Sequence, residues 1–301
     1  TPENKIYYLP YLTGMNGAST TLNAGQYEEA KLDYASFKTF EDFYSAAKTL
    51  TQTEGDSIKR AGMSIWAHIL TVIKSWIWQM GGEFFNSENG KWSHATDVGE
   101  AAAQIIYDLY WKHGVCDFEL FNSEFEAVSQ KLVSIWGDGA WTAGVQTDVA
   151  QIPADNIVTP PLANAVVDVL YPQHIAGFGL SRRLANAPEK LKPALDFALA
   201  VTSPDGLIQA FDFYSGVCMT KAVYEDPRIE QVKYGLMSKR VATGMWPKAR
   251  FTRDHVANQG PAATELDRAM RKEISIREAL VNMDKYLQEQ EDQARERIGL
   301  M

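Results

Sequence analysis

The sequence has few cysteines, little positive charge and no long hydrophobic run, and each shortage excludes a class of protein. Only Cys116 and Cys218 occur in 301 residues, so there is neither a zinc-finger spacing nor a disulfide framework, although one bridge between them stays open. Lys and Arg total 29 against 38 Asp and Glu, and this net charge of −9 disfavours nucleic acid or an anionic membrane as a partner. The longest apolar stretch, residues 65–80, is too short and too often interrupted to span a bilayer.

Motifs of the common enzyme classes are also missing. The sequence contains no G-x-S-x-G elbow, no H-E-x-x-H helix and no P-loop, and Gly177-x-Gly179 lacks the third glycine of a dinucleotide-binding fingerprint. The five histidines stand apart from one another, so no local metal-ligand spacing exists. Carboxylates are plentiful, and a glycosidase-like pair stays open. We expect no catalytic residue, no metal and no cofactor.

The first residues, TPENKIYYLPY, are neither a signal peptide nor an initiator methionine followed by a domain. Polar residues lead at once into a strand predicted at residues 6–9, which Pro10 ends. This favours a chain whose N-terminal portion has been removed. A length of 301 residues predicts two domains.

Helical patterns dominate the remainder of the chain. Residues 39–50 form a capped amphipathic pattern, with Thr39 followed by Asp42, and residues 65–80 are apolar nearly all round and end at Gly81 and Gly82. Other helices are expected at residues 97–113, 191–201, 207–213 and 229–237 and from residues 123, 261 and 275. The pattern at residues 191–201 places Leu191, Leu195, Ala198 and Leu199 on one side.

Strands are short and scattered, which is typical of an α/β protein rich in helix. Residues 55–62 are interpreted as a connection, residues 83–92 as a hairpin, residues 157–161 as a strand and residues 166–179 as strand-like. The charged run at residues 288–297 is interpreted as the solvated face of the last helix.

The stretch IWGDGAWTAG, at residues 135–144, is the most distinctive in the sequence. It places Trp136 and Trp141 on either side of a glycine turn that contains Asp138, directly after a predicted buried strand. Glycines allow a sharp bend, so an aromatic ring can be carried to the end of the strand and directed across a cleft. For any single tryptophan the alternative is that the ring fills the core.

Aromatic residues near glycine or proline extend this pattern. A sugar ring stacks its C–H face on an aromatic ring while polar side chains bind its hydroxyl groups. We therefore expect a cleft lined by Trp66, Trp141, Trp246, Phe178 and Tyr214. Trp76 and Trp78, inside the buried helix, are expected in the core.

Several motifs occur in an order found in one protein family. KIYYLPY at residues 5–11 resembles G-K-x-Y-x-x-P, YEEAKLD at 27–33 stands where Y-N-K-D-L-F-x-x-A-G-L-D occurs, and residues 39–50 resemble T-W-x-E-F-x-x-A-A-K-K-L. Residues 135–141 resemble M-x-I-x-G-x-W. Further matches are Gly81-Gly82, Pro160-Pro161, residues 191–204, residues 226–229 and residues 275–280. In these motifs the chain resembles the family 1 extracellular solute-binding proteins, the maltose-binding-protein-like sugar-binding subunits of ABC importers.

The resemblance implies an α/β, two-lobed periplasmic-binding-protein-like fold of type II, with a helix-rich second lobe. The family's strand–helix portion before K-x-Y-x-x-P has no counterpart in the sequence, so the first lobe is expected to be incomplete. The implied division gives residues 1–10 and 157–217 to the first, N-terminal lobe and residues 11–156 and 218–301 to the second, C-terminal lobe. Crossings near Pro10, Val158 and Lys221 would form the hinge.

The function implied is that of a bacterial extracytoplasmic protein, periplasmic or lipid-anchored at the cell surface. It would be a monomer that captures a sugar or oligosaccharide between its lobes and delivers it to the permease subunits of an ABC transporter, without a chemical step. Trp141, Trp66 and Trp246 would stack on the ligand, and the polar partners would be His68, Asp138 and Arg250. Two alternatives stay open, a carbohydrate-active enzyme with a carboxylate pair and a degenerate protein-interaction module.

Overall fold

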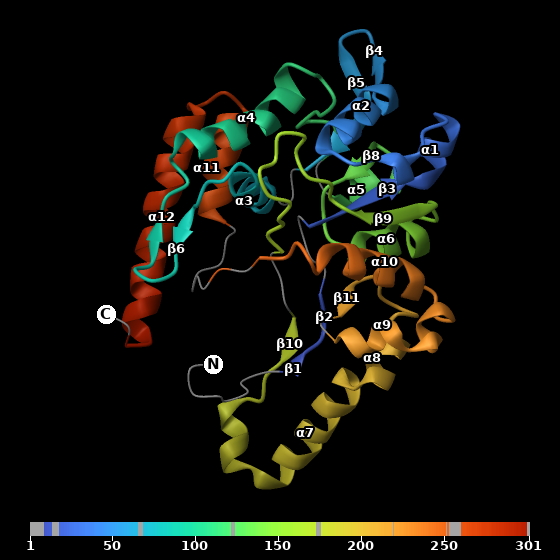
Figure 1. Ribbon diagram of the computed structural model, residues 1–301, viewed down its shortest axis with the longest axis vertical. Helices are drawn as coiled ribbons and strands as arrows, with labels where there is room; N and C mark the ends of the chain where they lie inside the picture. The colour runs from blue at the N-terminus through green and yellow to red at the C-terminus, as the bar shows by residue number, and fades with distance from the viewer. Residues whose placement is uncertain are drawn as a thin grey trace.

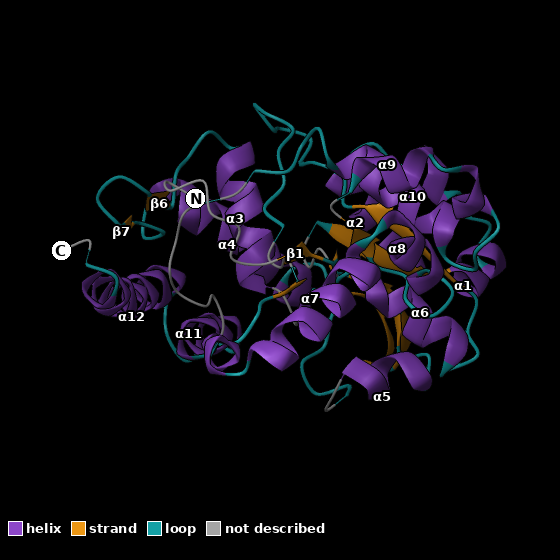
Figure 2. Cartoon of the chain, turned by 90° about the horizontal axis from the view of Figure 1, so that it is seen from below, coloured by secondary structure: helices purple, strands orange, loops and turns teal. Residues whose placement is uncertain are grey.

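The computed structural model describes residues 9–13, 18–65, 69–121, 124–172, 176–218, 220–250, 252 and 260–299. Two parts lie beside each other in Figure 1, a sheet covered by helices and a layer built mainly of helices. The helix α7 extends below both parts. Figure 2, seen from below, again separates the helical layer from the sheet.

The central sheet has five strands in the order β4-β5-β8-β3-β9. β5 and β8 are parallel, whereas the other neighbouring pairs are antiparallel. These strands are β3 (Ser19–Asn23), β4 (Gln52–Glu54), β5 (Ser57–Ser64), β8 (Val133–Trp136) and β9 (Ala154–Val158). Three smaller antiparallel pairs are β1 (Leu9–Pro10) with β10 (Gly177–Phe178), β2 (Leu12–Thr13) with β11 (Val217–Cys218), and β6 (Phe85–Asn86) with β7 (Lys91–Trp92).

The helices surround this sheet and form the second layer. Against the sheet or near it lie α1 (Ala24–Glu29), α2 (Phe40–Leu50), α5 (Glu124–Ser129), α6 (Trp141–Asp148), α8 (Pro204–Ala210), α9 (Lys221–Glu225) and α10 (Gly235–Met245). The helical layer contains α3 (Ile69–Gln79), α4 (Asp97–Trp111), α11 (Pro261–Met270) and α12 (Ile276–Arg297), and α7 is Pro188–Thr202. Short 3-10 helices are η1 (Tyr34–Ser36), η3 (Arg182–Asn186) and η4 (Pro227–Glu230).

Local signals predicted several of these elements correctly. α2 begins after Thr39, whose backbone N–H donates to the Asp42 carboxylate at 2.8 Å, as the capping pattern requires. Every residue of α3 is buried, and Trp76 and Trp78 are core residues with 1% exposure each. The predicted hairpin is β6–β7.

Two predictions of irregular or extended structure were wrong, and a third was right about the strand but not about its bounds. Residues 57–62, expected as part of a connection, belong to β5, where Gly62 lies so close to α2 that an added Cβ would be 1.9 Å from the Ala47 carbonyl oxygen. The strand predicted at 157–161 is β9, Ala154–Val158. Among the described residues of 166–179, only Gly177–Phe178 form a strand.

The charged run near the C-terminus is not wholly solvated. Glu291 and Arg295 are 0% and 8% exposed, and Arg295 Nε donates to Glu291 at 2.7 Å. The guanidinium also donates to the Ser87 carbonyl at 3.2 Å. Gly90 in the β6–β7 turn leaves the space that the Arg295 guanidinium fills, because an added Cβ would be 2.2 Å from Nε. The last helix is therefore joined to the hairpin by a buried arginine, whose charge is paired with Glu291 of the same helix.

The apolar side of α7 is exposed to solvent for most of its length. Ala198 is 3% exposed, but Leu191, Leu195 and Leu199 are 38%, 40% and 49% exposed. The helix contacts β1, η3 and α8, and β1 contributes only two residues. The residues at this small two-stranded sheet are too few to cover the leucine stripe.

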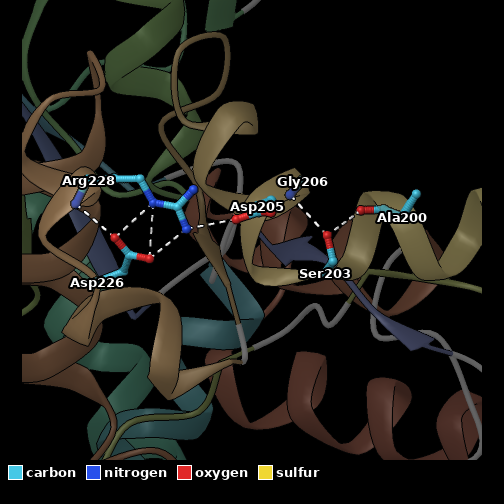
Figure 3. A network of polar contacts seen from close by, with 6 residues as sticks. All are labelled: Ala200, Ser203, Asp205, Gly206, Asp226 and Arg228. Atoms are coloured by element: carbon cyan, nitrogen blue, oxygen red, sulfur yellow. Dashed lines mark hydrogen bonds and ion pairs between the residues drawn. The ribbon is translucent and has the colours of Figure 1, made fainter.

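A polar network fixes the corner between α7 and α8 (Figure 3). Ser203 caps α8 by accepting from Gly206 N at 3.2 Å and donates to the Ala200 carbonyl at 2.6 Å. Two residues further on, Asp205 accepts from Arg228 at 2.7 Å, and Arg228 also pairs with Asp226. These contacts lower the pKa of Asp226, chiefly through its hydrogen bonds with Arg228. The D-P-R motif thus holds α8 against η4.

Both cysteines are free and buried. Cys116 Sγ donates to the Met63 carbonyl at 2.7 Å, and Cys218 lies in β11. Burial raises the pKa of both thiols.

Among the described residues, no helix is both long and apolar enough to cross a membrane.

Replacing Gly62 by alanine should destabilise the fold, because β5 and α2 leave no room for a methyl group. We expect the free energy of unfolding to fall by about 2 to 3 kcal/mol. Urea denaturation monitored by circular dichroism measures this change. Gly25→Ala is the control: its nearest neighbour would be Asn23 Oδ1 at 3.6 Å, so stability should be unchanged or rise by about 0.5 kcal/mol. Equal stabilities for both variants would contradict the close approach of β5 to α2.

Candidate functional site

The candidate site is built on the end of β8. All four residues of this strand are buried, and it lies between β5 and β3 in the sheet. The chain then turns through residues 137–140 and begins α6 at Trp141. Gly137 is required in this turn, because a Cβ there would be 2.5 Å from Ile65 Cγ2. The turn therefore places the partly exposed Trp141 ring at the end of a rigid strand.

Asp138 holds the turn together from inside. Its side chain is completely buried, and its carboxylate accepts hydrogen bonds from Gly139 N at 2.5 Å and from Trp136 Nε1 at 3.3 Å. Its backbone carbonyl lies 3.5 Å from the Ser19 hydroxyl on β3. The sequence placed Asp138 at the rim of a ligand site, and that role stays a prediction. The structure adds a second role. The carboxylate connects the Trp136 indole, before the turn, to the Gly139 backbone within the turn.

The first turn of α6 is attached to the sheet by buried hydroxyl groups. Thr142 Oγ1 lies 2.5 Å from Thr21 Oγ1 of β3, and Asn156 of β9 donates to the same Thr21 oxygen at 2.7 Å. Thr20 and Thr159 make a similar pair at 2.9 Å. Trp141 thus stands beside a residue that is bonded to β3, which Asn156 in turn connects to β9.

Tyr214 and Tyr11 both pack, partly buried, against the hydrophobic cluster that contains Ala140. The pKa of Tyr214 is raised to about 12, first by burial and then by the negative charges of Asp138 and of ionised Tyr11, which places these groups near one another. Burial also raises the pKa of Tyr11. Both phenols therefore remain protonated, and able to donate hydrogen bonds, at neutral pH.

Phe178 extends this group toward the small β1–β10 sheet. The Tyr11 and Phe178 rings meet edge to face, with centroids 5.2 Å apart, and Tyr11 N donates to the Ala176 carbonyl at 2.8 Å. Tyr11 lies between β1 and β2. The aromatic side chains of the site thus continue from the central sheet to the short strands beside α7.

The remaining predicted residues are placed differently. Trp246 follows α10 and packs, partly buried, against the hydrophobic cluster that contains Ala140; within the described part of the chain its buried Nε1 has no acceptor. Arg250 pairs with Glu83 at 2.7 Å and lies 4.4 Å from the centre of the Trp78 ring, so its contacts are with the end of α3. Trp66 and His68 lie outside the described residues.

Two residues at this site were not singled out from the sequence as ligand contacts or supports. Tyr11 was noted only as part of a strand motif, although it stands directly after Pro10 in KIYYLPY. Ser215 was missed altogether, and it hydrogen-bonds to the first turn of α6 from 71 residues away. Tyr11 could have been found from its motif, whereas no local pattern points to Ser215. Among the described residues, no group of three or more His, Cys, Asp or Glu side chains could hold a metal ion.

Comparisons with known proteins identify the fold. No protein-family profile and no curated protein matches the sequence. Among solved structures, the chain is similar to the ABC substrate-binding protein Lmo0181 of Listeria monocytogenes, in complex with cycloalternan, with a TM-score of 0.75 and 14% identity over 99% of this chain and 73% of the other. It is also similar to UgpB of Mycobacterium tuberculosis, in complex with glycerophosphocholine, with a TM-score of 0.72 and 14% identity over 94% of this chain and 70% of the other. The GacH receptor of Streptomyces glaucescens, solved unliganded and with acarbose, has a TM-score of 0.71 and 16% identity over 96% of this chain and 72% of its own.

These similarities confirm the expected α/β, two-lobed fold of the type II periplasmic binding proteins. The exact division into residues 1–10 with 157–217 and 11–156 with 218–301 stays a prediction.

Asp138→Ala should destabilise the turn because it leaves the buried Gly139 N–H and Trp136 indole N–H without their carboxylate acceptor. We expect a loss of about 2 kcal/mol in the free energy of unfolding. Asp138→Asn retains one acceptor oxygen in a side chain of the same shape and should lose less. Urea denaturation of the two variants beside the parent measures both values. An alanine variant as stable as the parent would show that the carboxylate does not hold the turn.

Proposed function

We propose that this chain is an extracytoplasmic solute-binding protein that captures a carbohydrate and delivers it to an ABC transporter. The observation that carries the proposal is Trp141, a partly exposed ring on the first residue of α6, at the end of a buried strand. Asp138 and Thr142 fix the backbone on either side of that ring. A rigid aromatic face is suited to stacking on a sugar, because little side-chain freedom is lost on binding.

The tyrosines near Trp141 supply the polar half of such a site. Tyr214 and Tyr11 are kept protonated by burial, and each phenol can donate to or accept from a sugar hydroxyl. Phe178 offers a further ring next to Tyr11. Trp246 belongs to the same hydrophobic cluster as Ala140, one residue before Trp141, which supports its inclusion at the edge of the site.

The names of the similar structures favour carbohydrates over other solutes. Cycloalternan and acarbose accompany two of them, whereas glycerophosphocholine accompanies the third. A glycerol phosphodiester is thus the second ligand class. The net charge of −9 and the tyrosine-rich surroundings of Trp141 favour an uncharged sugar over an anion.

Binding would be coupled to closure of the two lobes. Tyr11 and Tyr214 lie directly beside β2 and β11, which pair with each other near the proposed chain crossings. A ligand that contacts residues of both lobes selects the closed form, because only there are all contacts made. In this proposal the closed monomer is what the permease subunits recognise, outside the cytoplasm, and no chemical step takes place.

One observation favours a second candidate, a protein-interaction module. The exposed leucines of α7 form an apolar stripe that would suit contact with another polypeptide. A carbohydrate-active enzyme has less support, because the carboxylate nearest Trp141 is buried and bonded to the turn.

The carbohydrate proposal predicts that Trp141→Ala weakens sugar binding at least about 10-fold, through loss of the stacking face. Calorimetric titration with maltotriose, cyclic and linear glucans and glycerophosphocholine measures the dissociation constants. Trp111→Ala is the matched control, because Trp111 is 47% exposed on α4 and its ring lies under Lys272 instead of at this site.

Equal affinities of the Trp141 variant and the parent would refute the stacking role. Binding of no carbohydrate or phosphodiester by the parent, together with saturable capture of a polypeptide that Leu195→Glu abolishes, would favour the interaction module. Release of free sugar from glycosides by the parent, but not by a boiled sample, would favour an enzyme.

A further inference from the structure

The Ser215 hydroxyl group bridges two backbone groups in the first turn of α6. It accepts a hydrogen bond from Gly144 N at 2.9 Å and donates one to the Ala140 carbonyl at 2.7 Å. These two groups are four residues apart, the spacing that a helical hydrogen bond joins. A side chain placed between such groups sets the local direction of the helix.

The arrangement leaves little freedom at either end of the bridge. Ser215 is 1% exposed, and a Cβ on Gly144 would lie 3.0 Å from the Ser215 oxygen, so the glycine provides the space for the hydroxyl. Ala140, the residue before α6, has no side chain that could cap the helix. The first turn of α6 is therefore bridged by a residue from a distant segment.

That segment also carries Tyr214 and leads into β11. β11 pairs with β2, with Val217 opposite Thr13 and Cys218 opposite Leu12. Ser215 thus connects the helix that begins with Trp141 to the strand pair beside Tyr11. On its other side the same helical turn is bonded to β3 through Thr142 and Thr21.

The two attachments have different consequences. The Thr142 attachment joins α6 to the central sheet, so the helix stays in place when Ser215 changes. The Ser215 attachment determines how the first turn, and the Trp141 ring on it, is oriented relative to Tyr214. Loss of the hydroxyl should therefore alter the site without removing the helix.

We propose that Ser215 is a positioning residue that holds Trp141 and Tyr214 in one binding geometry. The role as a support for ligand binding rests on the carbohydrate-binding function proposed above. The contact between Ser215 and the Trp141 turn is independent of that function and can be tested without a ligand.

The test compares Ser215→Ala with Ser75→Ala. Ser75 is a suitable control because it is 2% exposed and likewise accepts one backbone hydrogen bond, from Tyr171 N at 2.9 Å, and donates another, to Thr71 O at 3.3 Å. It lies on α3, in the helical layer. Ser215→Cys, with a weakly bonding group of similar shape, provides an intermediate variant.

The first measurement is fluorine NMR of the protein labelled with 5-fluorotryptophan. The sequence contains eight tryptophans, and the Trp141 signal is assigned by its loss in Trp141→Phe. We expect Ser215→Ala to shift or broaden the Trp141 signal, Ser215→Cys to do so less, and Ser75→Ala to leave it unchanged.

The second measurement is the dissociation constant for maltotriose. Ser215→Ala should weaken binding about 10-fold, because a ring held in several orientations stacks less often in the productive one, whereas Ser75→Ala should change it less than about 2-fold. In a double-mutant cycle, Ser215→Ala should have little further effect once Trp141 is alanine.

An unchanged Trp141 signal in Ser215→Ala would overturn the proposal, whatever the affinities. A shifted signal together with equal losses of affinity in both serine variants would overturn the role in binding. If the parent binds neither maltotriose nor the other sugars, the proposed function fails, and the fluorine signal alone then decides whether Ser215 positions Trp141. A Ser215→Ala protein that does not fold leaves Ser215→Cys for the same comparison.

Discussion

The central constraint in this structure is that polar groups buried beneath the candidate site must find partners. β3 has the sequence STTLN, and all five residues are buried. A buried hydroxyl group without a partner costs free energy. Here Thr21 pairs with Thr142, and Thr20 pairs with Thr159. These pairs connect β3, β9 and α6 into one unit.

Elements defined by neighbouring residues could be predicted from the sequence. The cap of α2 needs only Thr39 and Asp42, and burial of α3 follows from a mostly apolar stretch with no polar face. β5 was missed because Gly62 is usually a signal for a connection, while here it allows α2 to pack closely. The burial of Glu291 and Arg295 was missed because their partner surface, around Gly90, lies some 200 residues earlier. Contacts of that range leave no periodic trace in a single sequence.

The candidate site shows the same division between local and distant information. The glycine turn and Trp141 were evident in IWGDGAW, and Tyr214 was chosen for its aromatic ring. The proximity of Tyr214 to Asp138 and Tyr11 arises from strand pairing between β2 and β11, which two short strands do not reveal in advance. Arg250 was chosen for its charge, but its bond to Glu83 and its stacking on Trp78 direct it to the end of α3. Residue type suggested the chemistry, whereas topology decided which residues meet.

The two buried thiols make the chain convenient for site-specific labelling. Cys116 is bonded to the Met63 carbonyl of β5, and Cys218 is buried in β11. Burial disfavours the reactive thiolate in both. A maleimide dye or spin label would therefore react first with a cysteine introduced at an exposed position, without prior removal of the native pair. With one such label on the water-facing side of α7 and another on α12, the distance between the two labels would report directly how far these helices move relative to each other.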